Sequence, residues 1–205
     1  MKLYTYAAAP NARRLHLFMD YKGIELETEE VDLRSRQQHC EPYASINPLR
    51  TIPALLLDDA SLLTEVIAQV DYLESLYPEK PLLGRDALER AMILNWDHYL
   101  HLSGLVTVAN IFRNTSSAFA GRAQTGSLEL EQIPALAERG KLQLEDFWPR
   151  LETRLAQSEW VAGDNFSFAD IDLCCVVEFA AWVEAGIPED AGRLQAWHQR
   201  ALDSM

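Results

Sequence analysis

The sequence predicts a mixed α/β domain at residues 1–78 followed by an all-helical domain at residues 86–205. Three observations support this. Strand-type and helix-type hydrophobic patterns alternate in the first part, a Pro- and Gly-containing linker covers residues 79–85, and only long helical patterns follow. The chain has 205 residues, 48% of them hydrophobic and 24% charged, which is enough for two small domains with buried cores.

The first domain opens with a strand and a helix. Lys2–Tyr6 is a short apolar and aromatic run typical of a strand. Pro10 then stands where the first turn of a helix tolerates proline, and apolar residues at helical spacing continue as far as Gly23, a favoured left-handed helix end. Alternation from Ile24 to Val31 predicts a second, partly exposed strand.

A loop, a hairpin and a helix complete the first domain. Residues 32–47 are polar and mixed, and they predict a loop or a short helix. Ile52–Leu57 is a continuous apolar strand that turns back into the short strand Ser61–Thr64. Glu65–Tyr77 carries apolar residues on one helical face, so we expect a helix there.

Four helical stretches are predicted in the second domain, at residues 86–114, 128–157, 168–185 and 191–203. The third opens with Ser167 as N-cap and Asp170 as its reciprocal capping partner, while Phe166 and Ile171 form a hydrophobic staple. We interpret this motif as structural.

Charge and composition exclude several function classes. The net charge of −13 disfavours nucleic acid and anionic lipid as partners. No signal peptide and no apolar run of membrane-spanning length is visible, so we expect a cytoplasmic protein without a membrane partner. Three cysteines encode no disulfide framework. His98 and His101 have metal-ligand spacing but no third ligand, so we expect no metal site.

Two segments predict binding of an extended peptide through the backbone. Asn47–Pro53 places a proline at the start of a strand, and a cis Ile52-Pro53 bond would leave the Ile52 N–H and C=O free to pair with a ligand. At the next strand-to-helix junction, the N–H groups of Glu65 and Val66 form an anion site for a carboxylate. The Glu65 side chain then suits an ammonium group.

Taken together, these marks resemble the cytosolic glutathione S-transferase superfamily, in a bacterial form, over essentially the whole chain. The shared motifs are the opening of the first helix, the proline loop, the strand-to-helix junction, a Trp-containing turn and the capping box: Ala9–Arg14, Asn47–Pro53, Thr64-Glu65, Trp160–Asp164 and Ser167/Asp170. In this order and spacing they form a specific combination.

The resemblance implies a thioredoxin-like first domain that binds glutathione as co-substrate, and a two-fold homodimer. Ile52, beside Pro53, pairs with the cysteinyl unit, and Glu65 with Val66 holds the γ-glutamyl end. The glycine carboxylate is contacted by His39, Arg50 or Thr51. The acceptor, a small hydrophobic electrophile or a disulfide, lies against the second domain near Trp96, Tyr99 and Ser103.

Two residues depart from the family pattern. Ala9 stands where many members have Ser or Cys beside the sulfur, and Val66 stands where many have Ser. Stabilisation of the thiolate then falls to the helix N-terminus, to Asn11 or to Tyr6. Asn11 is the first choice because its amide donates without ionising. The Ala-Pro-Asn motif also resembles bacterial Nu-class members, in which an asparagine lies near the sulfur.

The predicted function is conjugation of the glutathione thiolate to an electrophile. Two alternatives stay open. One is glutathione-dependent disulfide reduction, which is the stronger activity of the Nu class. The other is a non-catalytic binding or regulatory protein, an interpretation to which Ala9 and Val66 contribute.

Overall fold

A computed structural model describes all residues 1–205 and divides the chain into two compact units. The first unit consists of Met1–Glu79 together with Gln124–Leu130, and the second consists of Lys80–Ala123 and Glu131–Met205. The order predicted from the sequence, an α/β part followed by an all-helical part, is confirmed.

A four-stranded sheet forms the centre of the first unit, with strand order β2-β1-β3-β4. Strand β1 pairs in parallel with β2, and the β1–β3 and β3–β4 pairs are antiparallel. The strands are β1 Lys2–Thr5, β2 Glu27–Glu30, β3 Ala54–Leu56 and β4 Leu62–Leu63. The second strand is shorter than the predicted Ile24–Val31. Its acidic side chains mark it as an edge strand, and Lys2 pairs with Glu27 and Glu29 at 3.1 and 2.8 Å.

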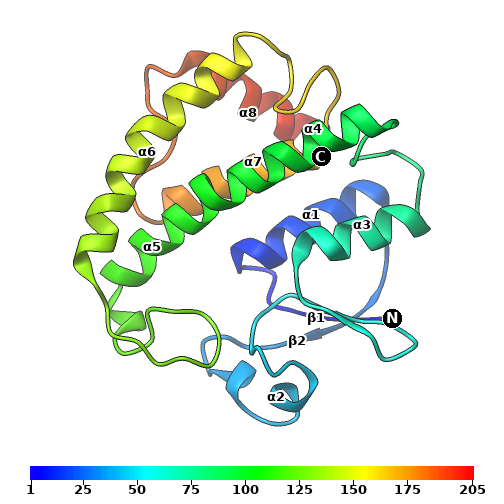
Figure 1. Cartoon of the computed structure of the whole chain (residues 1–205), viewed down its shortest axis with the longest axis vertical. Helices are drawn as coiled ribbons and strands as arrows, with labels where there is room; N and C mark the ends of the chain where they lie inside the picture. Colours follow the sequence, from blue (N-terminus) through cyan, green and yellow to red (C-terminus); the bar gives the residue numbers. More distant parts are fainter. The chain divides into compact units, whose positions relative to one another are not determined.

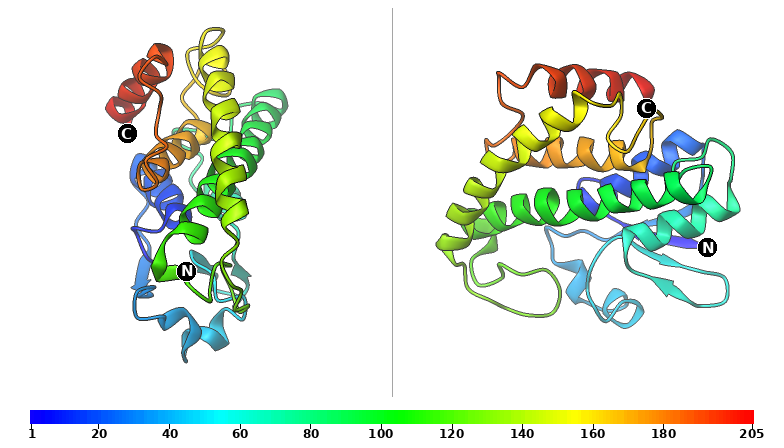
Figure 2. Two further views of the ribbon diagram at one scale, coloured as in Figure 1. Left: turned by 90° about the vertical axis from the view of Figure 1, so that its left-hand side faces the viewer. Right: turned by 45° about the horizontal axis from the view of Figure 1, so that its top comes forward.

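Helices α1 (Pro10–Lys22) and α3 (Val66–Leu76) lie side by side on one side of this sheet (Figures 1 and 2). A buried ion pair of 2.6 Å between Lys22 Nζ and Glu74 Oε2 joins them. The predicted polar segment contains two short helices, η1 (Gln37–His39) and α2 (Tyr43–Ile46).

A distant segment, Gln124–Leu130, also belongs to the first unit. Arg36 Nη2 lies 3.1 Å from Glu129 Oε1. Gly126 has a φ of 99°, and a Cβ there would lie 3.3 Å from the Leu49 carbonyl oxygen. The predicted helix at residues 128–157 is therefore wrong at its start, because residues 128–130 pack in the first unit and the helix begins only at Pro134.

The second unit is a helical bundle around α7. Figure 2 shows this helix enclosed by its neighbours, and nearly all of its residues are buried. The elements are α4 Ala87–Leu100, η2 His101–Leu105, α5 Val106–Thr115, η3 Ser117–Phe119, α6 Pro134–Leu155, α7 Phe168–Ala181 and α8 Gly192–Ser204. No helix combines the length and the apolar composition that crossing a membrane requires.

The predicted helix at residues 86–114 is interrupted by η2, a turn of π-helix. A π turn adds one residue to the helical repeat, so the faces of α4 and α5 are rotated relative to each other. Two glycines allow close helix packing here. A Cβ on Gly104 would lie 2.8 Å from Val176 Cγ2, and one on Gly140 would lie 2.7 Å from Ile111 Cγ1.

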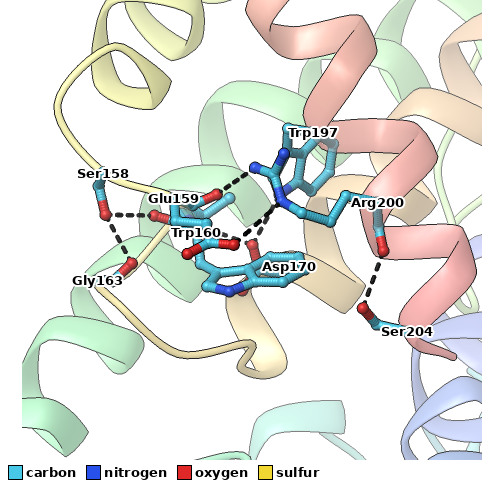
Figure 3. A network of polar contacts seen from close by, with 9 residues as sticks. Ser158, Glu159, Trp160, Gly163, Asp170, Trp197, Arg200 and Ser204 are labelled. Carbon is cyan, nitrogen blue, oxygen red and sulfur yellow. Dashed lines mark hydrogen bonds and ion pairs between the residues drawn. The ribbon is translucent and has the colours of Figure 1, made fainter.

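The carboxylate of Asp170 is the polar centre of the second unit (Figure 3). It is fully buried at the start of α7. Oδ1 accepts from the Val161 N–H at 2.9 Å and from Trp197 Nε1 at 2.8 Å, and Oδ2 accepts from the N–H and hydroxyl of Ser167, both at 3.0 Å. Burial raises the pKa of Asp170 to about 6 in spite of these donors. The capping motif therefore also joins α7 to α8.

Arg200 of α8 makes a second set of contacts with the loop before α7 (Figure 3). Its Nη2 donates to the Glu159 carbonyl at 2.6 Å, and its guanidinium lies 5.0 Å from the ring centroid of Trp160. The Trp-containing turn noted in the sequence is thereby held against the C-terminal helix.

Candidate functional site

Three chain segments meet at one edge of the sheet of the first unit, namely the edge formed by the ends of the strands. Tyr4 of β1 pairs with Ala54 of β3, so the end of β1 lies beside the start of β3. Leu55 of β3 pairs with Leu63, so the end of β4 lies beside them. The β1–α1 turn, the proline loop and the β4–α3 junction therefore face the same edge.

The N-terminus of α1 offers unpaired donors. Ala9 is the N-cap with no side-chain cap, and the first helical hydrogen bond runs from the Arg13 N–H to the Ala9 carbonyl at 2.8 Å. The N–H groups of Asn11 and Ala12 have no partner within the chain. These groups carry the positive end of the helix dipole, which favours an anion.

Asn11 is exposed and lies in the first turn of α1, and it does not cap the helix. Its Oδ1 accepts from Nη1 of the buried Arg14 at 3.2 Å. Because this contact occupies the acceptor end of the amide, the donor end is left for a ligand. Tyr6 precedes the helix, and its carbonyl accepts from the Ala9 N–H at 2.8 Å. No hydrogen bond from the Tyr6 hydroxyl is present.

The Ile52-Pro53 peptide bond is cis, as the sequence suggested. The Thr51 carbonyl accepts from the Tyr43 hydroxyl and from Asn47 Nδ2, the latter at 2.8 Å. Burial raises the pKa of Tyr43, so its hydroxyl remains a donor at neutral pH. The N–H and C=O of Ile52 make no hydrogen bond within the chain, so they are available to an extended ligand.

Gln69 of α3 secures the other side of this loop. Its Nε2 donates to the Pro53 carbonyl at 3.1 Å and to the Leu63 carbonyl at 2.8 Å, and the side chain is fully buried. Sequence reasoning missed this residue. The available signal was a polar residue on the apolar face of the helix, between Val66 and Val70.

The N-terminus of α3 is a second group of unpaired donors. Glu65 is the N-cap and is exposed, and its carbonyl accepts from the N–H groups of Ala68 and Gln69, both at 3.1 Å. The N–H groups of Val66 and Ile67 have no partner within the chain. The sequence had suggested the N–H groups of Glu65 and Val66 as the donors of an anion site, so the two pairs share Val66, and binding of an anion there stays a prediction.

Two of the residues predicted to contact the glycine carboxylate are neighbours. Arg50 Nη1 lies 3.5 Å from His39 Nδ1, and both side chains are partly buried. Arg50 has a φ of 56°, a left-handed backbone that is uncommon for a residue other than glycine. The polar loop and the proline loop therefore place an imidazole and a guanidinium together.

The three residues predicted near the acceptor lie in the second unit and are used in helix packing. The ring of Tyr99 stacks on Phe147 of α6 at 6.0 Å, and its hydroxyl bonds to Ser103. The Trp96 ring lies 5.5 Å from the guanidinium carbon of Arg154, also of α6. Burial raises the pKa of Tyr99. Their role toward an acceptor stays a prediction.

Comparison with known proteins identifies the family. The family model for the N-terminal domain of glutathione S-transferases matches residues 8–76, and the model for the C-terminal domain matches residues 118–204. The chain belongs to the cytosolic glutathione S-transferase superfamily. The thioredoxin-like sheet followed by an all-helical part is accordingly the glutathione S-transferase fold.

Individual relatives align over nearly the full length. Glutathione S-transferase 2 of Saccharomyces cerevisiae is 27% identical over 202 residues, covering 98% of this chain and 84% of that protein. GstA of Escherichia coli O157:H7 is 27% identical over 205 residues, covering 99% and 93%. A glutathione S-transferase domain-containing protein of Marinobacter aquaeolei VT8 superposes with a TM-score of 0.89 at 26% identity, covering 98% and 96%.

Proposed function

We propose that this member of the superfamily binds glutathione along the described sheet edge and activates its thiol for attack on a small electrophile. One observation supports this proposal above all. The backbone donors of three segments, at α1, at Ile52 and at α3, are unpaired and lie at the same edge of the sheet of the first unit. A tripeptide with two carboxylates and a thiolate complements such a row of donors.

Each segment has a role in this proposal. Ile52 pairs with the cysteinyl backbone as a neighbouring strand would. The N–H groups at Val66 hold the γ-glutamyl carboxylate, and Glu65 pairs with its ammonium group. His39, Arg50 and Thr51 are proposed to contact the glycine carboxylate. Ala9 contributes no hydrogen bond to the sulfur.

Asn11 is the proposed donor to the thiolate, and Tyr6 is the alternative. Donors from the Asn11 amide and from the start of α1 stabilise the charged sulfur and lower its pKa. The thiolate then attacks the electrophilic carbon and forms a C–S bond, while a leaving group departs with its electron pair or a proton is taken up after addition. Proximity and electrostatics supply most of the rate.

Disulfide reduction is the second candidate, and Asn11 beside a non-nucleophilic Ala9 favours it. In that reaction the bound thiolate attacks a disulfide sulfur and releases a thiolate, so no protein cysteine is needed. Comparing turnover of a mixed glutathione disulfide with turnover of an aryl halide separates the two activities.

The primary experiment is titration with glutathione by calorimetry, together with thiolate absorbance against pH for the unmodified protein and for Asn11→Ala. Saturable binding with a thiol pKa below that of free glutathione, raised by Asn11→Ala, supports the proposal. Absence of binding would overturn it in favour of a non-catalytic member of the fold. The family resemblance also leads us to propose a homodimer, which sedimentation measurements test.

A further inference from the structure

The segment Gln124–Leu130, here called the strap, contacts two loops of the first unit although it is distant from both in the sequence. Glu129 Oε1 lies 3.1 Å from Arg36 Nη2 in the polar loop. Gly126 lies against the proline loop, close enough that an added Cβ would be 3.3 Å from the Leu49 carbonyl oxygen. Two strap residues that are three positions apart therefore contact two separate loops.

Both of these loops carry residues predicted to contact the glycine carboxylate of glutathione. Arg36 is the N-cap of η1, and its carbonyl accepts from the His39 N–H at 2.9 Å. Leu49 is followed directly by Arg50, and Arg50 Nη1 lies 3.5 Å from His39 Nδ1. Each strap contact therefore falls within three residues of one member of the His39–Arg50 pair.

The backbone of both loops is left-handed at an arginine. Arg36 has a φ of 63° and Arg50 has a φ of 56°. This conformation costs free energy in residues other than glycine, so it persists where surrounding contacts hold it. The Arg50 N–H donates to the Asn47 carbonyl at 2.9 Å within its own loop, whereas the Arg36 side chain is held by Glu129 of the strap. Contacts with the strap therefore help to fix the backbone that presents His39 and Arg50.

The strap is the tip of a loop whose base is closed in the second unit. Gln132 Nε2 donates to the carbonyls of Arg113 and Ser116 at 2.6 and 2.8 Å, so the chain before the loop is joined to the chain after it. Closing the base in advance removes part of the entropy that ordering the tip would cost. The ion pair between Arg36 and Glu129 is exposed and weak by itself, but it acts here on a tip that is already restrained.

We propose that the strap fixes the spacing of His39 and Arg50 and thereby makes the site selective for a peptide with a free glycine carboxylate. Glu129 and Gly126 are positioning residues, because they act through the two loops. This inference rests on the proposed function, since it concerns one end of the same glutathione site. Two donors at a fixed spacing favour a carboxylate, whereas an ester carries no charge and accepts weaker hydrogen bonds.

The test compares the affinities of glutathione and of its glycine monoethyl ester, measured by calorimetry at low ionic strength. The ester keeps the thiol and the γ-glutamyl end but removes the charge at the glycine end. In Gly126→Val a branched side chain meets both the φ of 99° and the Leu49 carbonyl. We expect the glutathione-to-ester affinity ratio to fall at least about threefold there, because losing a hydrogen bond to a charged group entirely costs about tenfold or more. Glu129→Gln should lower the ratio by about twofold.

Each variant has a matched control. Glu131→Gln removes the same charge as Glu129→Gln from an exposed residue of the second unit, and Gly186→Val adds a side chain where a Cβ meets no atom within 4 Å. Both should leave the ratio unchanged. The double variant Arg36→Glu with Glu129→Arg should restore a ratio that either single reversal lowers. Thermal unfolding shows that each variant is folded. A ratio that is the same in Gly126→Val and in the unmodified protein would overturn the inference, as would equal binding of the two ligands by the unmodified protein.

Hydrogen exchange of the full chain without ligand separates this inference from the proposed function. The N–H groups of His39, Cys40 and Arg50 donate to carbonyls of their own loops. Faster exchange at these amides in Gly126→Val than in Gly186→Val supports the strap as the element that holds the two loops, even if no glutathione binds. Unchanged exchange overturns it, even if glutathione binds to every variant. Absence of glutathione binding by the unmodified protein overturns the proposed function and the selectivity with it, and exchange alone then decides whether the strap holds the loops.

Discussion

Gln69 donates a hydrogen bond to the Pro53 carbonyl at 3.1 Å, so a buried side chain of α3 supports the loop whose neighbouring Ile52 backbone is proposed to bind glutathione. The same amide nitrogen also donates to Leu63 at the end of β4. One fully buried residue therefore holds two of the three segments of the site.

Replacing Gln69 with Leu should destabilise the protein by about 1–3 kcal/mol, because the buried Pro53 carbonyl and the partly buried Leu63 carbonyl lose their donor. Glutathione affinity should fall as well, since the proline loop is less firmly held. Urea unfolding and calorimetry measure the two effects. Ser75→Ala on the exposed side of the same helix is the control and should change stability by less than about 0.5 kcal/mol. If the glutathione affinity of Gln69→Leu were unchanged, Gln69 would not position the proline loop for binding.

Asn11→Asp should separate helix stability from thiol activation. A carboxylate in the first turn of α1 interacts favourably with the helix dipole and can still accept from Arg14, so the melting temperature should be unchanged or higher. The same charge beside the glutathione sulfur should raise the thiol pKa by about 1 unit or more. Thiolate absorbance against pH checks this. If the thiol pKa did not change, Tyr6 would become the preferred donor to the thiolate.

Val66→Ser should tighten glutathione binding. The hydroxyl adds a donor beside the unpaired Val66 N–H, and one such hydrogen bond is worth about 1 kcal/mol, or roughly fivefold in affinity. The protein should become less stable, because Val66 is only 5% exposed. Calorimetry gives the affinity. Weaker binding would show that the γ-glutamyl carboxylate lies elsewhere.

Asp170 should make stability depend on pH. Its folded pKa of about 6 exceeds the value of 3.8 for a free side chain, so its protonated form favours the folded state. This contribution is complete below pH 3.8 and is lost as pH rises through about 6. The free energy of unfolding, relative to the non-titrating Asp170→Asn, should therefore fall from pH 4 to pH 6.5. The free energies of unfolding are obtained from urea unfolding at each pH. If they changed with pH in the same way in both proteins, the raised pKa of Asp170 would be contradicted.

Gly140→Ala should destabilise the second unit by about 1–3 kcal/mol through overpacking. Its Cβ would lie 2.7 Å from Ile111 Cγ1 and 3.2 Å from the Thr107 carbonyl oxygen, so α5 and α6 must move apart. Gly192→Ala is the matched control. It has no neighbouring atoms within 4 Å of the added carbon, and alanine favours the start of α8. Equal melting temperatures for the two variants would show that the helix pair adapts.

The sequence was informative where local chemistry determines structure. Pro10 and Gly23 mark the ends of α1. Apolar runs and one alternating pattern predict all four strands, although β2 is shorter than expected. The cis bond at Pro53 was also anticipated. These features depend on backbone preferences of single residues, which are visible without tertiary contacts.

Features that depend on packing could not be predicted. The position of Gln69 on the apolar face of α3 is visible in the sequence, but its partners are carbonyls of other segments, which no local pattern identifies. The π turn at His101–Leu105 has no composition signal, and it changes which residues share a face. The structure packs Trp96 and Tyr99 on α6, a contact that the sequence does not show, and their role toward an acceptor stays a prediction.

The segment Gln124–Leu130 bears on how the protein is made. On a ribosome, the first unit cannot be completed when residue 79 emerges, because Glu129 and Gly126 still have to be synthesised before they reach Arg36 and Leu49. Part of the helical unit, through α5, leaves the exit tunnel in the meantime. Assembly of the two units is therefore interleaved during translation, and a clean cut after residue 79 would yield a fragment that lacks part of its own fold.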